Sequence, residues 1–272
     1  MEHVRHTETP LTRIQKLIAS RMLASKLSKP CFYIEAHADV GEILTFRKKL
    51  TKKAATKITT NTFFLRALAV STRQFPRMIG LLEDGCVRIA EHVNVGFAVN
   101  APQGVIVPVI KDADRKSLSQ IAEQEQRFVQ HARSNDLPLA DMEGETIALS
   151  NLGAYGVDAF AAIIPPPATA ILAVGNVLRE VVPVEACPEA AGSTQGVSLS
   201  RSEGLDRVEG VSPSIRGQDA RDTRNTAVRK AVRFTLAVDR RVVDEIYAAR
   251  FLRAIVERVE NPRSLADLDL ED

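Results

Sequence analysis

The sequence predicts a single α/β domain. The length of 272 residues allows one large hydrophobic core, and 45% of the residues are hydrophobic. Stretches with helical periodicity alternate with short apolar or alternating stretches typical of strands. No segment is repeated, and no second set of elements follows the first. We therefore expect residues 1–272 to form one domain. A flexible insertion is expected at 185–225, where Gly, Ser and charged residues are frequent and the few apolar residues follow neither helical nor strand periodicity.

The first predicted element is a helix over 11–28. Thr9 or Thr12 is expected to cap it, and Pro30 to end it. The prediction rests on apolar residues spaced three and four apart, which are Leu11, Ile14, Leu17, Ile18 and Met22.

The rest of the chain alternates between the two kinds of element. Pro108 should place one strand at a sheet edge or a bulge, because proline donates no ladder hydrogen bond. Asp244 is the expected cap of the last helix, whose inward residues are predicted to include Leu252 and Val259. The predicted helices are 42–52, 62–74, 117–134 and 243–261, and the predicted strands are 31–40, 87–89, 93–99, 104–110, 146–150, 168–174 and 228–238.

Composition excludes several classes of function. Lys plus Arg number 36 against 34 for Asp plus Glu, and there is no Trp, so we expect neither a nucleic-acid nor a membrane partner. Cys31, Cys86 and Cys187 lack the spacing of a metal site, so no metal is expected. No apolar signal core begins the chain, and no run of about 18 apolar residues exists. We expect a cytoplasmic protein.

Four groups of segments stand out along the chain: TRIQKLIASRM at 12–22; VNVGFAV at 93–99 with GVIVPVI at 104–110; LSNLG at 149–153 with PPA at 166–168 and ILAVG at 171–175; and DRRVVD at 239–244 with ARFL at 249–252. In this order they resemble the catalytic domain of the dihydrolipoyl acyltransferases, the core subunits of 2-oxo acid dehydrogenase complexes. The resemblance covers nearly the whole chain.

The resemblance implies a chloramphenicol-acetyltransferase-like two-layer α/β sandwich with a mixed sheet that assembles as a trimer. The active site of that family lies between two subunits, where CoA or acyl-CoA meets the acyl acceptor. A histidine of the family motif Asp-His-Arg-Val-Val-Asp-Gly takes the proton of the attacking thiol. An aspartate four residues later organises the site, and a serine donates a hydrogen bond to the oxyanion.

Three residues occupy these positions here. Ser150 matches the oxyanion donor, although a serine before Asn-Leu-Gly is also typical of a turn. Asp244 matches the organising aspartate, and its alternative role is the helix cap. Arg240 replaces the histidine, and a guanidinium stays protonated and accepts no proton. Glu245 replaces the motif glycine, and Cys31 stands where many relatives have histidine.

The loss of the base affects acceptors differently. A thiol with a pKa near about 8.5 is partly ionised at neutral pH, whereas an alcohol needs a substitute base. The residues considered for that role are His37, His92, Asp239 and Asp244. His37 and His92 are more typical of strand surfaces.

Three functions follow as hypotheses. The preferred one is transfer of an acyl group from CoA or an acyl-carrier thioester to a small molecule, including a hydroxyl of a tetronate-type natural product; the chain starts almost at the catalytic domain and shows no lipoyl domain. The second is a non-catalytic core subunit of a dehydrogenase complex. The third is an enzyme with a thiol acceptor or altered chemistry, in which Arg240 binds an anionic group. The expected partners are a small-molecule acceptor, further copies of the chain in a homotrimer or higher oligomer and, where the acyl donor is a carrier thioester, an acyl carrier protein.

Overall fold

The computed structural model describes residues 7–52, 56–102, 104–183 and 226–266. The chain divides into two units, Met1–Leu178 with Lys230–Asp272 and, separately, Arg179–Arg229. The predicted insertion at 185–225 lies outside the described residues. All elements that carry the predicted site belong to the first unit.

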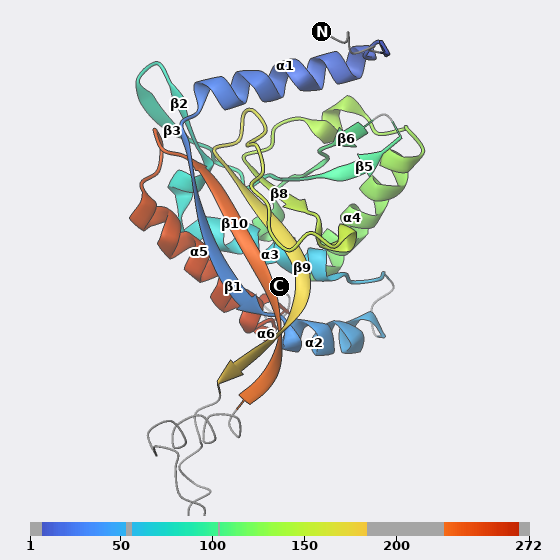
Figure 1. The fold of residues 1–272 in the computed structure, drawn as a ribbon, viewed down its shortest axis with the longest axis vertical. Helices are drawn as coiled ribbons and strands as arrows, with labels where there is room; N and C mark the ends of the chain where they lie inside the picture. Colours follow the sequence, from blue (N-terminus) through green and yellow to red (C-terminus); the bar gives the residue numbers. More distant parts are fainter. Residues whose placement is uncertain (1–6, 53–55, 103, 184–225, 267–272) are drawn as a thin grey trace, which may run out of the picture. The chain divides into compact units, whose positions relative to one another are not determined.

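A six-stranded mixed sheet forms the centre of the first unit (Figure 1). β1 is an edge strand and pairs antiparallel with β10, from Cys31 opposite Asp239 to Asp39 opposite Ala231. β8 runs parallel to both of its neighbours, β4 and β9, and β7 closes the other edge antiparallel to β4. In spatial order the strands are β1 (Cys31–Asp39), β10 (Thr226–Asp239), β9 (Ala170–Pro183), β8 (Ile147–Asn151), β4 (Val95–Phe97) and β7 (Val109–Ile110).

A layer of helices covers one face of this sheet, as the two-layer prediction required. α3 (Thr60–Gln74) is its central helix, and every residue from Thr62 to Thr72 is buried. α5 (Glu245–Glu260) packs against α3 and β1 and buries the predicted Leu252 and Val259. α4 (Leu118–Arg133) and α2 (Gly41–Thr51) pack against α3. Alternate strand residues such as Leu149, Leu172 and Leu236 fill the core between the layers.

The opposite face of the sheet meets a proline-rich segment, 163–168, and this segment is in turn bound by α1 (Arg13–Ser28). Three side chains spaced four residues apart along α1 and its C-cap donate hydrogen bonds to carbonyls of this segment. The bonds are Arg21 Nη2 to Pro166 O at 2.8 Å, Ser25 Oγ to Ile164 O at 2.6 Å, and Lys29 Nζ to Ala168 O. The apolar residues of α1 have less cover within one chain, since Leu17, Leu23 and Leu27 are 60%, 61% and 78% exposed.

Most predicted elements are confirmed, including the caps Thr12 and Asp244 and the helix end before Pro30. The predicted strand 104–110 is instead broken at Val107–Pro108. β6 (Gly104–Ile106) pairs with β5 (Val99–Ala101), and β7 joins the sheet edge, as Pro108 suggested. The predicted strand 93–99 is likewise divided between β4 and β5.

One strand and several short helices were not predicted. β2 (Gly80–Glu83) forms a hairpin with β3 (Cys86–Ile89) through Asp84 and Gly85, whose positive φ angles of 50° and 75° suit this tight turn. The Asp-Gly pair was the signal for it. The short helices are η1 (Pro76–Ile79), η2 (Ala113–Arg115), η3 (Leu139–Met142), η4 (Gly153–Tyr155) and α6 (Arg263–Ala266). No helix within the described ranges is long and apolar enough to span a bilayer.

Candidate active site

Ser150 lies near the carboxyl end of β8, opposite Ala173 of β9. Its neighbours Ile147 and Leu149 point into the core beneath the helices, whereas Ala148 belongs to the apolar cluster on the other face. The alternation of side chains along a strand therefore puts Ser150 on the face away from the helices. Its side chain is half-buried, and its Oγ has no hydrogen-bond partner among the described residues. The hydroxyl is thus available to donate to a ligand.

The turn after Ser150 is fixed by side-chain amides. Asn151 Oδ1 accepts a hydrogen bond from the Gly153 backbone N–H at 3.0 Å, and Asn151 Nδ2 donates to Asn61 Oδ1 at 3.1 Å. Asn61 belongs to the first turn of α3. A residue of the helix layer therefore holds the end of the strand that carries Ser150.

Glu125 of α4 completes this network. Its carboxylate is 8% exposed and accepts hydrogen bonds from Asn61 Nδ2 at 3.0 Å and Thr62 Oγ1 at 2.6 Å, with Thr59 Oγ1 at 3.2 Å. Burial raises the pKa of Glu125, while these three donors act in the opposite direction. Neither Asn61 nor Glu125 was predicted as a site residue, because nothing along the sequence links them to Ser150.

Asp239 and Arg241 form an ion pair at the end of β10. Asp239 is 2% exposed, and both of its oxygens accept from the guanidinium, with Arg241 Nη2 to Oδ2 at 2.7 Å and Nε to Oδ1 at 3.0 Å. The Arg241 backbone N–H also donates to Asp239 Oδ1. Asp239 is thereby occupied as an acceptor, so the structure gives no support to its predicted use as a base.

Arg240 pairs with Glu245, the two residues that depart from the family motif. Arg240 Nε lies 2.7 Å from Glu245 Oε1, and both side chains are about half exposed at 51% and 56%. A backbone hydrogen bond, and then the bond from Arg240, lower the pKa of Glu245. The Arg240 backbone N–H donates to the Pro30 carbonyl at 3.0 Å, which ties this segment to the start of β1.

Asp244 caps α5. Its Oδ1 accepts from the Tyr247 backbone N–H at 2.8 Å, as expected of an N-cap aspartate. This confirms the capping role, which is compatible with organising the Arg240 segment.

One chain does not bring Ser150 and Arg240 together. The Asp239 N–H donates to the Thr169 carbonyl, whereas Ser150 lies opposite Ala173, four residues further along the same strand. β9 separates β8 from β10. The two side chains are therefore apart by about 13 Å along the strands and about 10 Å across them. Direct cooperation between these residues requires the Arg240 of one chain and the Ser150 of another.

The two histidines considered as bases lie elsewhere. His37 pairs across the sheet with Arg233, six residues along β1 from the Cys31–Asp239 pair, or about 20 Å. Its Nε2 accepts from Arg233 Nε at 3.3 Å. His92 precedes β4, and its Nδ1 lies 2.7 Å from Asp112 Oδ1. Neither imidazole reaches Ser150 or Arg240 within the chain.

Lys29 and Cys31 lie beside the Asp239–Arg241 pair. Burial lowers the pKa of Lys29, and the nearby Asp239 acts against that change. Burial likewise raises the pKa of the Cys31 thiol. The Lys29 Nζ is directed at the Ala168 carbonyl, so it holds the proline-rich segment in place. In the part of the chain that the structure describes, no three His, Cys, Asp or Glu residues are grouped as a metal site.

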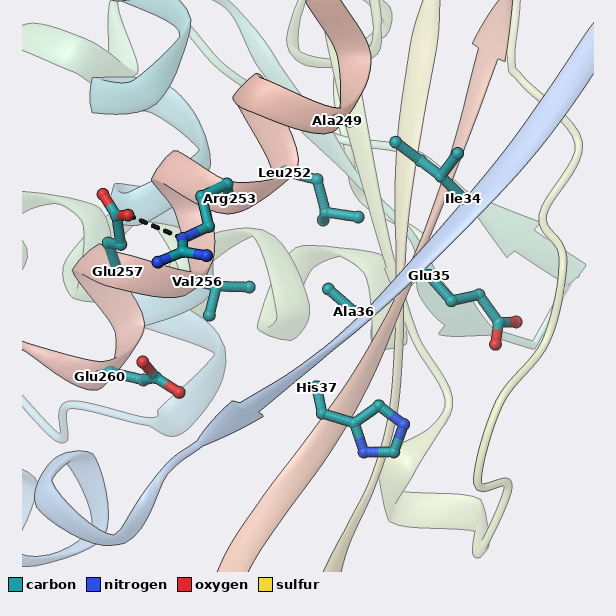
Figure 2. Close-up of a pocket in the computed structure, with 10 residues that line it drawn as sticks. All are labelled: Ile34, Glu35, Ala36, His37, Ala249, Leu252, Arg253, Val256, Glu257 and Glu260. Atoms are coloured by element: carbon teal, nitrogen blue, oxygen red, sulfur yellow. Dashed lines mark hydrogen bonds and ion pairs between the residues drawn. The ribbon is translucent and has the colours of Figure 1, made fainter. Parts of the chain in front are cut away.

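A groove on the helix side of the sheet edge lies away from Ser150 and Arg240 and has His37 in its lining (Figure 2). It has a volume of 660 Å³ and runs between the edge strand β1 and α5. Arg253 and Glu257 form an ion pair at 2.8 Å on its α5 side. Its lining residues are Ile34, Glu35, Ala36, His37, Ala249, Leu252, Arg253, Val256, Glu257 and Glu260. The groove therefore contains none of Ser150, Arg240 and Asp244.

Comparison with known proteins gives a consistent result. The family model described as 2-oxoacid dehydrogenases acyltransferase (catalytic domain) matches residues 3–266. The dihydrolipoyllysine-residue acetyltransferase component 3 of the pyruvate dehydrogenase complex of Arabidopsis thaliana is 33% identical to this chain. The match covers 96% of this chain and 42% of that protein. The pyruvate dehydrogenase protein X component of Mus musculus is 31% identical over 95% of this chain and 45% of its own length. The chain thus spans less than half the length of these relatives.

Solved structures of similar proteins share the fold. A probable dihydrolipoamide acetyltransferase from Listeria monocytogenes superposes with a TM-score of 0.77 at 26% identity, over 94% of this chain and 95% of that one. The Azotobacter vinelandii dihydrolipoamide acetyltransferase gives 0.77 at 27% identity, over 96% and 94%. That structure addresses the roles of a serine, a histidine and an asparagine in catalysis, the last two being four positions apart. Arg240 and Asp244 have the same separation here.

Proposed function

Because the chain belongs to the 2-oxoacid dehydrogenase acyltransferase (catalytic domain) family, we propose that it transfers an acyl group from a CoA or carrier thioester to a small-molecule acceptor. The observation that carries the proposal is Ser150, whose hydroxyl has no hydrogen-bond partner in the described chain and stands at the end of a firmly held strand. In this role Ser150 donates a hydrogen bond to the oxyanion that forms when the acceptor attacks the thioester carbon.

The proposed site lies between copies of the chain. Ser150 and Arg240 are too far apart to act on one carbonyl within a single chain, because they lie two strands apart and about four residues apart along β9. The exposed leucines of α1 provide apolar surface that a second copy can cover. We therefore propose a homotrimer or a larger assembly in which Ser150 of one copy faces the segment from Arg240 to Asp244 of the next.

Arg240 supplies positive charge in this mechanism. Its Nε donates to Glu245, and its other guanidinium N–H groups donate to none of the described residues. A positive charge beside an acceptor thiol favours the thiolate, which is the nucleophile. Asp244 fixes the start of α5 and so the position of this segment.

The absence of a base at the motif position favours one class of acyl acceptor. Within one chain neither His37 nor His92 reaches Ser150 or Arg240, and the carboxylate of Asp239 is held by Arg241. A thiol can react as its thiolate without a base, whereas a hydroxyl of a natural-product intermediate cannot. A thiol, including one on a carrier, therefore fits the site better than the hydroxyl first considered.

A second candidate is a core subunit without transfer activity. The observation that favours it is the Arg240–Glu245 ion pair, which places two mutually neutralising charges at the motif positions of the base and the glycine. The 31% identity to a protein X component is compatible with such a role.

Transfer from acetyl-CoA to a small dithiol separates the two candidates. We expect measurable transfer that falls about 10²-fold in Ser150→Ala, the typical loss for one oxyanion donor. Ser119→Ala removes an exposed hydroxyl on α4 and serves as the matched control. Absence of transfer by the native chain would contradict the proposed function and favour the core subunit, and equal measurable rates in the native chain and Ser150→Ala would contradict the role given to Ser150.

A further inference from the structure

The side chains of Glu125, Asn61 and Asn151 and the backbone N–H of Gly153 form a directional chain of hydrogen bonds, here called the amide relay. Glu125 Oε1 accepts from Asn61 Nδ2, Asn61 Oδ1 accepts from Asn151 Nδ2, and Asn151 Oδ1 accepts from Gly153 N. The distances are 3.0, 3.1 and 3.0 Å. Each amide donates at one end and accepts at the other.

The carboxylate sets the direction of this chain. A carboxylate only accepts, so it binds the nitrogen end of the Asn61 amide and leaves the oxygen end for Asn151. The same reasoning turns the Asn151 oxygen towards Gly153. Flipping either amide would place two donors or two acceptors against each other.

The turn that the relay ends on has little freedom to move. A Cβ at Gly153 would lie 2.6 Å from the Gly175 carbonyl oxygen, so β9 packs directly against the turn. The Leu152 N–H also donates to the Val174 carbonyl at 3.1 Å. Ser150 precedes this turn and points to the opposite sheet face. Its position therefore depends on a strand end that the relay holds from the helix side.

We propose that Asn61 and Glu125 are positioning residues that act through Asn151 to hold Ser150 where it can donate to the oxyanion. This deepens the proposed function and rests on it. The bonds from Thr59 and Thr62 to Glu125 join the start of α3 to α4 and stay within the helix layer. The link from Asn61 to Asn151 differs, because it joins α3 to the strand of Ser150.

A double-mutant cycle tests the relay through transfer rates. Asn61→Ala is expected to lower kcat about tenfold while KM for the acyl donor changes little, because a slightly displaced donor weakens only the transition state. In a Ser150→Ala background the same change should have no further effect. Equal losses in both backgrounds would overturn the proposal.

Two controls separate positioning from folding. Thr62→Val removes one hydrogen bond to Glu125 and the Thr62 half of the α3 capping box but leaves Asn61 in place, so it should lower Tm without a Ser150-dependent loss of kcat. Glu125→Gln should reduce kcat in the same Ser150-dependent way as Asn61→Ala. Glu123→Gln makes the same charge change at an exposed position of α4 and should leave kcat unchanged.

Hydrogen exchange tests the relay independently of transfer. In Asn61→Ala the amide of Gly153 should exchange about tenfold faster, while amides in the middle of α3 keep their native rates. Unchanged exchange at Gly153 would overturn the relay. If the native chain transfers no acyl group yet Gly153 exchange rises, the proposed function fails and the relay stands.

Discussion

The two ends of the predicted site are built from different kinds of contact. Around Ser150, neutral amides lead back to a buried carboxylate, and the hydroxyl itself has no hydrogen-bond partner among the residues that the structure describes. From Asp239 to Glu245, charged side chains pair with one another in two ion pairs. The difference shows that a hydrogen-bond network supports the strand end that carries Ser150. In the segment of Arg240, by contrast, the charged side chains are neutralised by their neighbours.

The largest expected effect comes from restoring the base. Arg240→His combined with Glu245→Gly should raise transfer to a thiol at neutral pH by up to about 10²- to 10⁴-fold, the range of a positioned general base. Arg240→His alone should give less. In that variant the Glu245 carboxylate no longer pairs with Arg240. Its negative charge raises the pKa of the new imidazole and so keeps the imidazole protonated.

Steady-state transfer from acetyl-CoA measures both variants, and circular dichroism checks that α5 survives glycine at its first position. A gain equal in the single and double variants would show that Glu245 does not influence the base position. No gain in either would show that the site lacks more than a base.

The next effect is the difference in stability between an ion pair with a buried carboxylate and an exposed ion pair. Arg241→Met removes the guanidinium from the buried Asp239 carboxylate and should lower the free energy of unfolding by about 2 kcal/mol, the range of hydrogen bonds to a charged group. Arg253→Met breaks an exposed pair with Glu257 and should cost below about 0.5 kcal/mol. Denaturant unfolding of both variants measures the difference, and equal losses would contradict the distinction.

The smallest effect is the pH dependence that Glu125 gives to stability. Its pKa is raised in the folded chain, so its protonated form stabilises the fold. This contribution is complete below the unfolded pKa of about 4.3 and is lost as pH rises through the raised folded pKa. Glu125→Gln should remove that loss, and Glu123→Gln should retain it. Unfolding curves between acid and neutral pH give the comparison.

Much of the fold was accessible from sequence because periodicity and caps act locally. The helices around α3 and α5, the Asp244 cap and the break at Pro108 follow from side chains within a few residues of each other. The strand β3 was predicted at 87–89, but β2 and the hairpin were missed although the Asp-Gly turn is a local signal, since β2 is only four residues long.

The site was less accessible, because its contacts join distant parts of the chain. Ser150, Arg240 and Asp244 were named from motif positions alone. Asn61 lies 90 residues from Asn151, and Glu125 lies 64 from Asn61, so no spacing rule connects them. The pairing of Arg240 with Glu245 also appears only in three dimensions, where the two departures from the family motif meet.

The pH dependence of the transfer rate tests most directly whether the site works without a protein base. With two thiol acceptors of different pKa, the native rate should rise about tenfold per pH unit and level off at the pKa of each acceptor, near about 8.5 for an ordinary thiol. The break should therefore shift with the acceptor. A break at the same pH for both thiols would contradict the account, because it would show that a residue of the protein takes the proton.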